Sequence, residues 1–190
     1  MREVRTIAVI SAGAAGRHIA ERSALGGFRT ILEDILPASL RRAEGAIRDS
    51  LEEAVQAGRI TRADANAAIA RLEFATSLED AAREADAVIE AVPDEFDSKE
   101  EIFRLLDRIC RPGTLLVASS LTIRVSDIAA ITERPTDIVG MRFRRSAGCA
   151  DDAIEIVPAT HTSEENLQTA LTVARRMSAQ LVVMPETEGR

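Results

Sequence analysis

The residues from Val4 to Asp34 constrain the fold of this chain more than any other stretch. An apolar, β-branched run over 4–10 ends in the turn Ser11-Ala12-Gly13-Ala14-Ala15-Gly16. An amphipathic segment follows, and a second apolar run over 28–32 stops at Glu33-Asp34. Strand, glycine-bearing turn, helix, strand and acidic residue, in this order, are typical of the first βαβ unit of a dinucleotide-binding fold.

The turn and the acidic residue predict how a dinucleotide would be held. Backbone N–H groups of the turn can approach a pyrophosphate at the positive end of the helix. Asp34, eighteen residues after Gly16, can accept hydrogen bonds from both hydroxyls of the adenosine ribose. A 2′-phosphate would meet a carboxylate there, so the sequence favours NAD over NADP. The cofactor residues predicted from this unit are Ser11, Gly13, Ala14, Ala15, Gly16 and Asp34.

The glycine pattern has one departure, because Ser11 stands where the first of three glycines is usual. If this position needs a left-handed backbone, the strain is about 1–3 kcal/mol. Replacement by glycine should then tighten NAD(H) binding, by about tenfold at most. The alternative interpretation is a doubly wound domain whose turn is rich in glycine for packing alone.

Composition and charge exclude several classes of partner. With 46% hydrophobic and 29% charged residues, the 190 residues suit one globular domain, and a net charge of −7 argues against a nucleic-acid partner. No apolar run approaches the length of a membrane span, and Met1 leads almost directly into the first predicted strand. Cys110 and Cys149 have no metal-ligand spacing. We therefore expect a cytoplasmic protein with no metal site.

A predicted helical hairpin over about 37–71 interrupts the strand–helix alternation. Pro37 suits a first helical turn and Gly58 suits a helix end, while Thr61 and Asp64 form a capping-box pattern. The alternation then resumes, with one helix predicted from Ser98 to about Cys110. The whole chain, 1–190, is predicted to be a single α/β domain of the Rossmann type, with a doubly wound, mostly parallel sheet and this hairpin inserted.

Several segments in order resemble one family. ATSLEDAAREADAV, IEAVPDEFDSKEEIF, GTLLVAS, VGMRF and AIEIVPATHTSEE are similar to the N-terminal NAD-binding domain of 3-hydroxyacyl-CoA dehydrogenases, from about Glu3 to Pro185. The resemblance implies NAD as cofactor. It also implies that Asp94, Lys99 and Ser120 contact the cofactor. For Lys99 the alternative is a solvated charge in the first turns of a helix.

The resemblance is broken where the family carries out its chemistry. Its general-base histidine lies in a motif similar to GxHFFNP, and here Arg142 takes that position in Gly140-Met141-Arg142-Phe143. A guanidinium stays protonated and has no lone pair, so it cannot act as a base. Glu155 matches the glutamate that orients the histidine, and we expect an ion pair between Arg142 and Glu155. The catalytic residues that the resemblance suggests are therefore Glu155, Arg142 and, as the nearest hydroxyl to the family's serine, Thr122.

Other groups near this motif suggest what could replace that chemistry. We expect neither His18 nor His161 to take the place of the base. Arg142, Arg144 and Arg145 could hold an anionic or acyl-CoA-like substrate. Ser50 matches a serine of the family's coenzyme A region, whereas the lysine of that region falls near Ala57.

Three functional hypotheses remain open. The first is an NAD-dependent oxidoreductase with altered or partner-assisted chemistry. The second is a non-catalytic NAD(H)-binding sensor or structural subunit, and the third is a relict fold that binds nothing. The family's helical C-terminal domain has no counterpart in the sequence, so we expect a homodimer or a complex with another chain.

Overall fold

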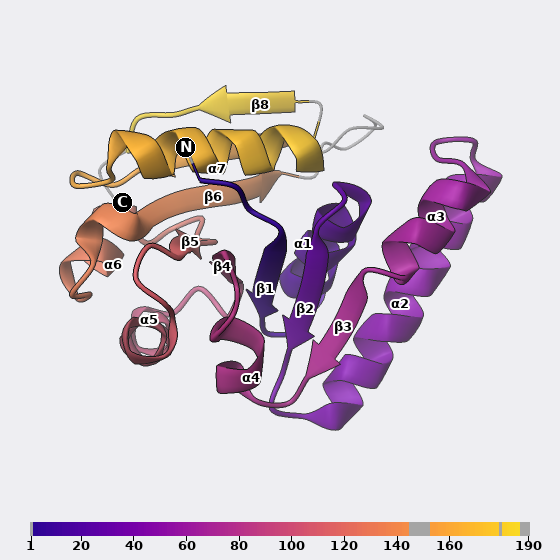
Figure 1. The fold of residues 1–190 in the computed structure, drawn as a ribbon, viewed down its shortest axis with the longest axis horizontal. Helices are drawn as coiled ribbons and strands as arrows, with labels where there is room; N and C mark the ends of the chain where they lie inside the picture. The colour runs from indigo at the N-terminus through magenta and orange to yellow at the C-terminus, as the bar shows by residue number, and fades with distance from the viewer. Residues whose placement is uncertain (1, 145–152, 179, 187–190) are drawn as a thin grey trace.

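A single eight-stranded sheet forms the centre of the computed structural model, which describes residues 2–144, 153–178 and 180–186. Arg145 and Cys149 lie outside the described residues. The strand order is β3-β2-β1-β4-β5-β6-β7-β8, and all neighbours are parallel except the antiparallel pair β6 and β7 (Figure 1). The strands are β1 Thr6–Ile10, β2 Arg29–Glu33, β3 Leu72–Ala75, β4 Ala87–Glu90, β5 Leu115–Ala118, β6 Ile138–Arg144, β7 Ala153–Pro158 and β8 Gln180–Val183.

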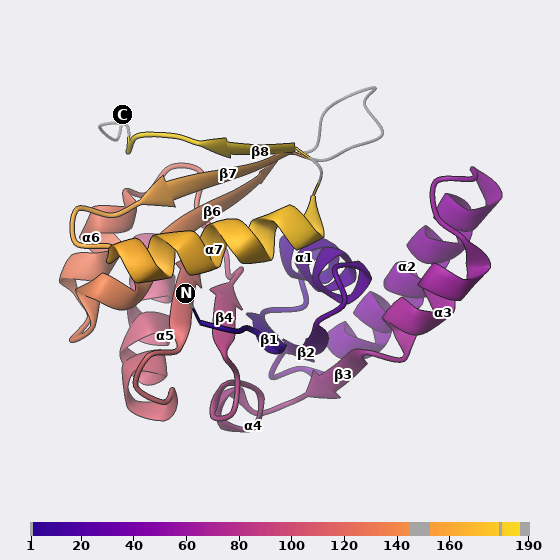
Figure 2. The ribbon, with the colours of Figure 1, turned by 45° about the horizontal axis from the view of Figure 1, so that its top comes forward.

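Helices cover both faces of this sheet and bury two apolar layers. One layer packs under α1, α7 and the hairpin formed by α2 and α3, and the other packs under α4, α5 and α6 (Figure 2). The bounds are α1 Ala14–Leu25, α2 Pro37–Gln56, α3 Arg62–Ile69, α4 Leu78–Ala82, α5 Phe96–Ile109, α6 Val125–Ala130 and α7 Glu164–Met177, with a 3-10 turn at Pro135–Asp137. The doubly wound, mostly parallel arrangement expected from the sequence is confirmed.

The helical hairpin lies between β2 and β3, as the sequence predicts. Pro37 occupies the first turn of α2, and Gly58 adopts a positive φ of 69° beyond its end. The Thr61 side chain accepts from the Asp64 amide while the Asp64 side chain accepts from the Thr61 amide, which is the predicted capping box. The two helices extend beyond the β3 edge of the sheet in both ribbon views (Figures 1 and 2).

The helix predicted to start at Ser98 begins earlier. Helix α5 starts at Phe96 with Glu95 as its N-cap residue, and no side chain caps it. The serine therefore lies in the first turn. The earlier start places Lys99 one turn into the helix, where its backbone amide donates to the Glu95 carbonyl.

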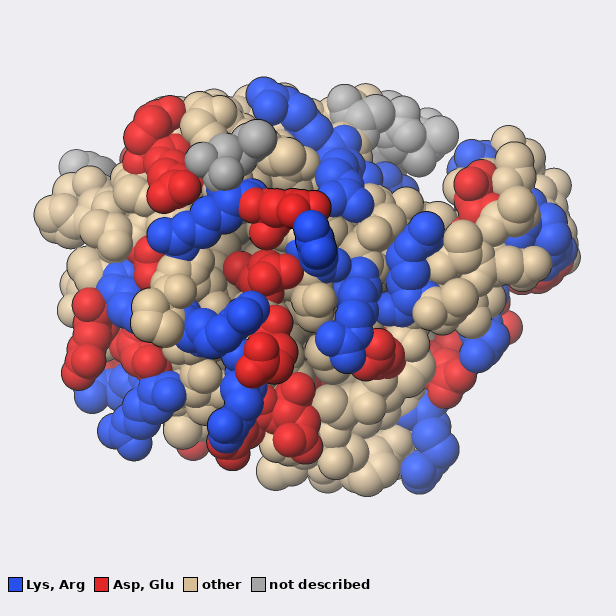
Figure 3. Space-filling model, viewed as in Figure 1, with Lys and Arg blue, Asp and Glu red and all other residues tan. Residues whose placement is uncertain are grey.

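The surface carries both signs of charge. In the view of Figure 3, basic and acidic side chains are interspersed and no broad basic patch forms on that face. Among the described residues, no helix is long and apolar enough to cross a membrane, and no cluster of side chains is suited to a metal ion.

Candidate functional site

The turn after β1 is strained at Ser11, which takes the place of the first glycine in the usual three-glycine pattern. Ser11 has a φ of 84°, and it is the one non-glycine residue with positive φ among the described residues. A serine in this region costs about 1–3 kcal/mol, so of the two cases that the sequence left open, the structure has the strained one. The Ser11 amide donates to the Glu33 carbonyl at 2.9 Å, which fixes the turn against the end of β2.

Helix α1 starts directly after this turn and approaches it closely. A Cβ built on Gly16 would lie 1.8 Å from the Ser11 carbonyl oxygen, so only glycine fits there. The N-cap residue Gly13 provides no side-chain cap, and the first turn of α1 contains no acidic residue. The first N–H groups of α1 are therefore left for an anion, as a pyrophosphate site requires.

Asp34 lies beside the turn from the end of β2. Its Oδ2 accepts from the Ala12 amide at 3.0 Å and its Oδ1 accepts from the Leu36 amide at 2.9 Å. A carboxylate has about four acceptor sites, so two bonds leave room for ribose hydroxyls. The two bonds also hold the carboxylate in place before any ligand arrives.

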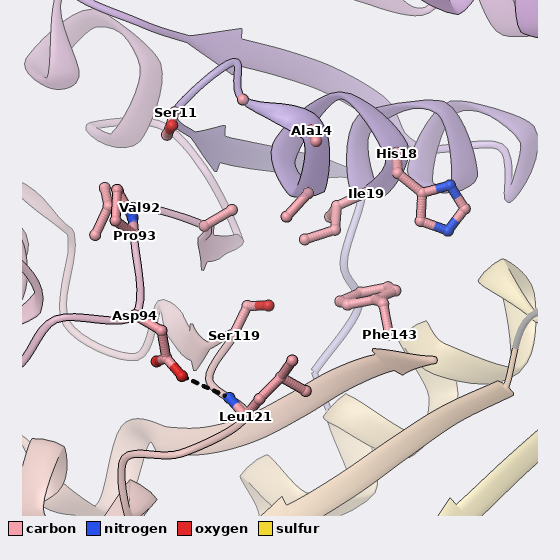
Figure 4. Close-up of a pocket in the computed structure, with 13 residues that line it drawn as sticks. Ser11, Ala14, His18, Ile19, Val92, Pro93, Asp94, Ser119, Leu121 and Phe143 are labelled. Atoms are coloured by element: carbon pink, nitrogen blue, oxygen red, sulfur yellow. Dashed lines mark hydrogen bonds between the residues drawn. The ribbon is translucent and has the colours of Figure 1, made fainter. Parts of the chain in front are cut away.

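Two cavities meet at this turn. One, of about 490 Å³, is open to Ser119, Leu121 and Phe143 on the β5–β6 side (Figure 4). The other, of about 620 Å³, lies on the β2 side and includes Asp34. Both include Ser11 and Val92 in their lining. The two cavities therefore adjoin each other at the carboxyl ends of the strands, where doubly wound folds bind ligands.

Asp94 organises the loop that follows β5. Its carboxylate accepts from the Ser120 hydroxyl at 2.6 Å, the Leu121 amide at 3.1 Å, and the Thr122 amide and hydroxyl at 3.0 and 2.7 Å. Burial raises the pKa of Asp94, but the hydrogen bonds from Ser120 and Thr122 outweigh it and the pKa lies below its ordinary value. Asp94 itself lines the 490 Å³ cavity. The structure thus brings three predicted residues, Asp94, Ser120 and Thr122, into one cluster.

Lys99 lies beneath that cluster and is fully buried. Its Nζ donates to both carboxylate oxygens of Glu90 at 2.9 Å and to the Ser119 carbonyl at 3.0 Å. The alternative of a solvated charge is therefore wrong. Because an ammonium group has three donors, these bonds also use all of them, and in this structure Lys99 supports the cavity wall instead of facing the cavity.

The expected ion pair between Arg142 and Glu155 is not formed. The two residues do face each other across β6 and β7, but the Glu155 carboxylate pairs with Arg144 at 2.7 Å. Arg142 instead donates its Nε to the Ser120 carbonyl at 3.0 Å. Strand β6 lies between β5 and β7, so its side chains can reach partners on either side. Arg144 reaches toward β7, whereas Arg142 reaches toward the loop after β5.

Two groups at the site were not among the predicted site residues. His18 lines the 490 Å³ cavity from α1, opposite Phe143 (Figure 4), although we did not expect it to take the place of the base. Glu33 is buried and lines the 620 Å³ cavity. Strand alternation contained a signal for Glu33, since it shares a face with the buried Ile31 and is polar where an apolar residue is usual.

Comparison with known proteins gives a consistent result. The family model described as "3-hydroxyacyl-CoA dehydrogenase, NAD binding domain" matches residues 6–187. A probable 3-hydroxybutyryl-CoA dehydrogenase of Bacillus subtilis is 30% identical over 98% of this chain and 64% of its own length. The 3-hydroxyadipyl-CoA dehydrogenase of Escherichia coli is 33% identical over 87% of this chain and 34% of its own.

A solved structure agrees with these matches. The crystal structure of 3-hydroxybutyryl-CoA dehydrogenase from Escherichia coli K12 superposes with a TM-score of 0.91 and 30% identity, over 99% of this chain and 39% of that chain. The chain spans less than two thirds of the length of the relatives named here.

Proposed function

Because the chain belongs to the family of 3-hydroxyacyl-CoA dehydrogenase NAD-binding domains, we propose that it binds NAD(H) across the Ser11–Gly16 turn. The observation that supports this most is the pair of cavities that meet at Ser11 and Val92. The adenosine would occupy the cavity that contains Asp34, and the nicotinamide would occupy the cavity that contains Ser119 and Phe143. The uncapped start of α1 would hold the pyrophosphate between them.

The residues of the site fit this cofactor. Gly16 lets the helix approach the turn, and the Asp34 carboxylate keeps acceptor sites for the ribose. Bound NAD would supply the acceptor or donor of a hydride. Asp94, Ser120 and Thr122 would shape the loop beside the nicotinamide, and Lys99 would support it from below.

The reaction we favour is a hydride transfer with altered or partner-assisted proton transfer. Arg142 cannot accept a proton, and Glu155 is paired with Arg144. The positive charge of Arg142 suits an anionic or acyl-CoA-like substrate, since among the described residues no carboxylate lies within 4.0 Å of it. The second candidate is a non-catalytic NAD(H)-binding sensor or structural subunit, and the missing base favours it. Association with a second copy or another chain stays a prediction.

NAD⁺ should bind with a dissociation constant below the millimolar range, and NADP⁺ should bind at least about tenfold more weakly. Asp34→Asn should reduce that preference, because the charge that repels a 2′-phosphate is removed. Calorimetry with both nucleotides measures this, and Asp97→Asn, an exposed carboxylate outside both cavities, is the control. No heat with either nucleotide at millimolar concentration would refute the proposal, and tighter NADP⁺ binding would refute the role of Asp34.

The isolated chain should reduce acetoacetyl-CoA with NADH slowly or not at all. A positioned acid or base contributes about 10²–10⁴ in rate, and Arg142 cannot supply it. Following NADH absorbance tests this, with NAD(H) affinity measured on the same sample. Rapid turnover would contradict the expectation, and its loss in His18→Gln would assign the proton transfer to His18.

A further inference from the structure

The 620 Å³ cavity on the β2 side has an unusual charge distribution. Three carboxylates contribute to its lining, namely Glu33, Asp34 and Glu101, and none of the lysines and arginines that the structure describes does so. The rest of the lining is mostly apolar: Ile10, Ile35, Leu78, Val92, Ile102 and Leu105. Such a cavity suits a flat, uncharged group that donates hydrogen bonds, and it disfavours an added phosphate.

Glu33 differs from the other two carboxylates in its burial. It is 7% exposed, whereas Glu101 is exposed on α5. The charged groups that face Glu33 from the elements around the cavity are Asp34, next to it in sequence, and Glu101. The lining residues from β1, from the loop before α4 and from the loop after β4 are uncharged.

The surroundings of Glu33 make its charge costly. Burial and, to a smaller extent, the Asp34 carboxylate raise the pKa of Glu33 to about 7, against the opposing effect of a hydrogen bond from the Ser11 backbone. Glu33 therefore changes charge in the neutral range, unlike an ordinary glutamate. Below that range the cavity has one negative charge fewer beside Asp34.

We infer that Glu33 is a second specificity-determining carboxylate at the adenosine end, which acts with Asp34 to exclude a phosphorylated ribose and does so more strongly as the pH rises. The inference rests on the proposed NAD(H) function, because it places the adenosine in this cavity. The dinucleotide-binding pattern of a glycine turn and one acidic residue after β2 does not include a second carboxylate such as Glu33. NAD⁺, with a neutral ribose, should be affected much less than NADP⁺.

The test measures dissociation constants for NAD⁺ and NADP⁺ at pH 6 and pH 8.5 by calorimetry. In the wild-type chain the ratio of the NADP⁺ constant to the NAD⁺ constant should rise about tenfold or more between these values. Part of this rise belongs to the 2′-phosphate, which itself ionises near pH 6. In Glu33→Gln that part should remain, and the total rise should be at least about threefold smaller.

Two further variants make the result specific. Glu33→Met removes the same charge with a different side chain and should reproduce the smaller rise. Asp97→Asn removes an exposed carboxylate of α5 that lies outside the cavity and should leave the ratio close to wild type. A rise in Glu33→Gln equal to that of the wild type would overturn the inference, as would an equal effect of Asp97→Asn or NADP⁺ binding that stays undetectable in both Glu33 variants.

A second measurement separates this inference from the proposed function. The folded-state pKa of Glu33 lies above its unfolded value, so the wild-type chain should lose stability as the pH rises from about 4.5 through about 7. Urea unfolding should show Glu33→Gln gaining midpoint concentration relative to wild type at pH 8.5 and not at pH 4.5. If this gain appears while NAD⁺ fails to bind, Glu33 titrates as inferred. The proposed NAD(H) function and the role of Glu33 in nucleotide specificity are then both refuted. If NAD⁺ binds and the gain is absent, the inference about Glu33 alone fails.

Discussion

Gly16→Ala should destabilise the fold by about 3 kcal/mol and abolish NAD(H) binding at concentrations that saturate the wild type. The added Cβ would lie 1.8 Å from the Ser11 carbonyl oxygen and 3.0 Å from its carbonyl carbon. Both contacts are with backbone, so no side chain can move aside, and overpacking of this kind costs 1–3 kcal/mol or more. Relief would require α1 to move away from the turn, which would take its N–H groups away from the pyrophosphate. Urea unfolding and NAD⁺ calorimetry measure the two effects.

Gly45→Ala is the matched control for this substitution. Gly45 lies exposed in the middle of α2, and a Cβ there would meet no atom within 4 Å. Because alanine is the better helix former, this variant should gain about 0.5–1 kcal/mol and bind NAD⁺ as the wild type does. Unchanged stability in Gly16→Ala, or loss of binding in both variants, would contradict the close approach of α1 to the turn.

The fold was predictable because its signals are local. The hairpin could be located from Pro37, Gly58 and the Thr61–Asp64 capping box, each of which acts within a few residues of its own position. The Ser11 backbone was only conditionally predictable, since the glycine pattern identified the position but not whether its φ is positive, as the structure has it. The order of the strand–helix units then left few arrangements for a parallel sheet.

The partners of charged side chains were less predictable. Lys99 could be assigned to a helix, but its burial depends on Glu90 of β4 and on the Ser119 carbonyl after β5, which only the folded sheet brings together. Glu155 was expected to pair with Arg142, its cross-strand neighbour, and pairs with Arg144 instead. Register places two candidates on one face, and it does not determine which of them a flexible side chain reaches.

Lys99→Met should destabilise the fold by about 3–5 kcal/mol at pH 8, the usual cost of leaving one partner of a buried ion pair alone. The side chains of Lys99 and its partner Glu90 are fully buried. Without the lysine, the Glu90 carboxylate would keep only the Val92 amide as a hydrogen-bond donor among the partners described. The exposed pair of Arg48 and Glu44 has the same separation of 2.9 Å on the surface of α2. Arg48→Met should therefore leave stability nearly unchanged, and urea unfolding compares the two.

The pH dependence of this loss identifies its cause. Burial raises the pKa of Glu90 to about 6 even though Lys99 lowers it, so removal of Lys99 should raise the pKa further. A carboxyl whose folded-state pKa exceeds its unfolded value costs stability as the pH rises through that folded-state pKa. The deficit of Lys99→Met should therefore grow between pH 5 and pH 8, and the further change Glu90→Gln should remove this growth. A deficit that is equal at both pH values would mean that lost packing of the lysine side chain, and not the unpaired charge of Glu90, destabilises the fold.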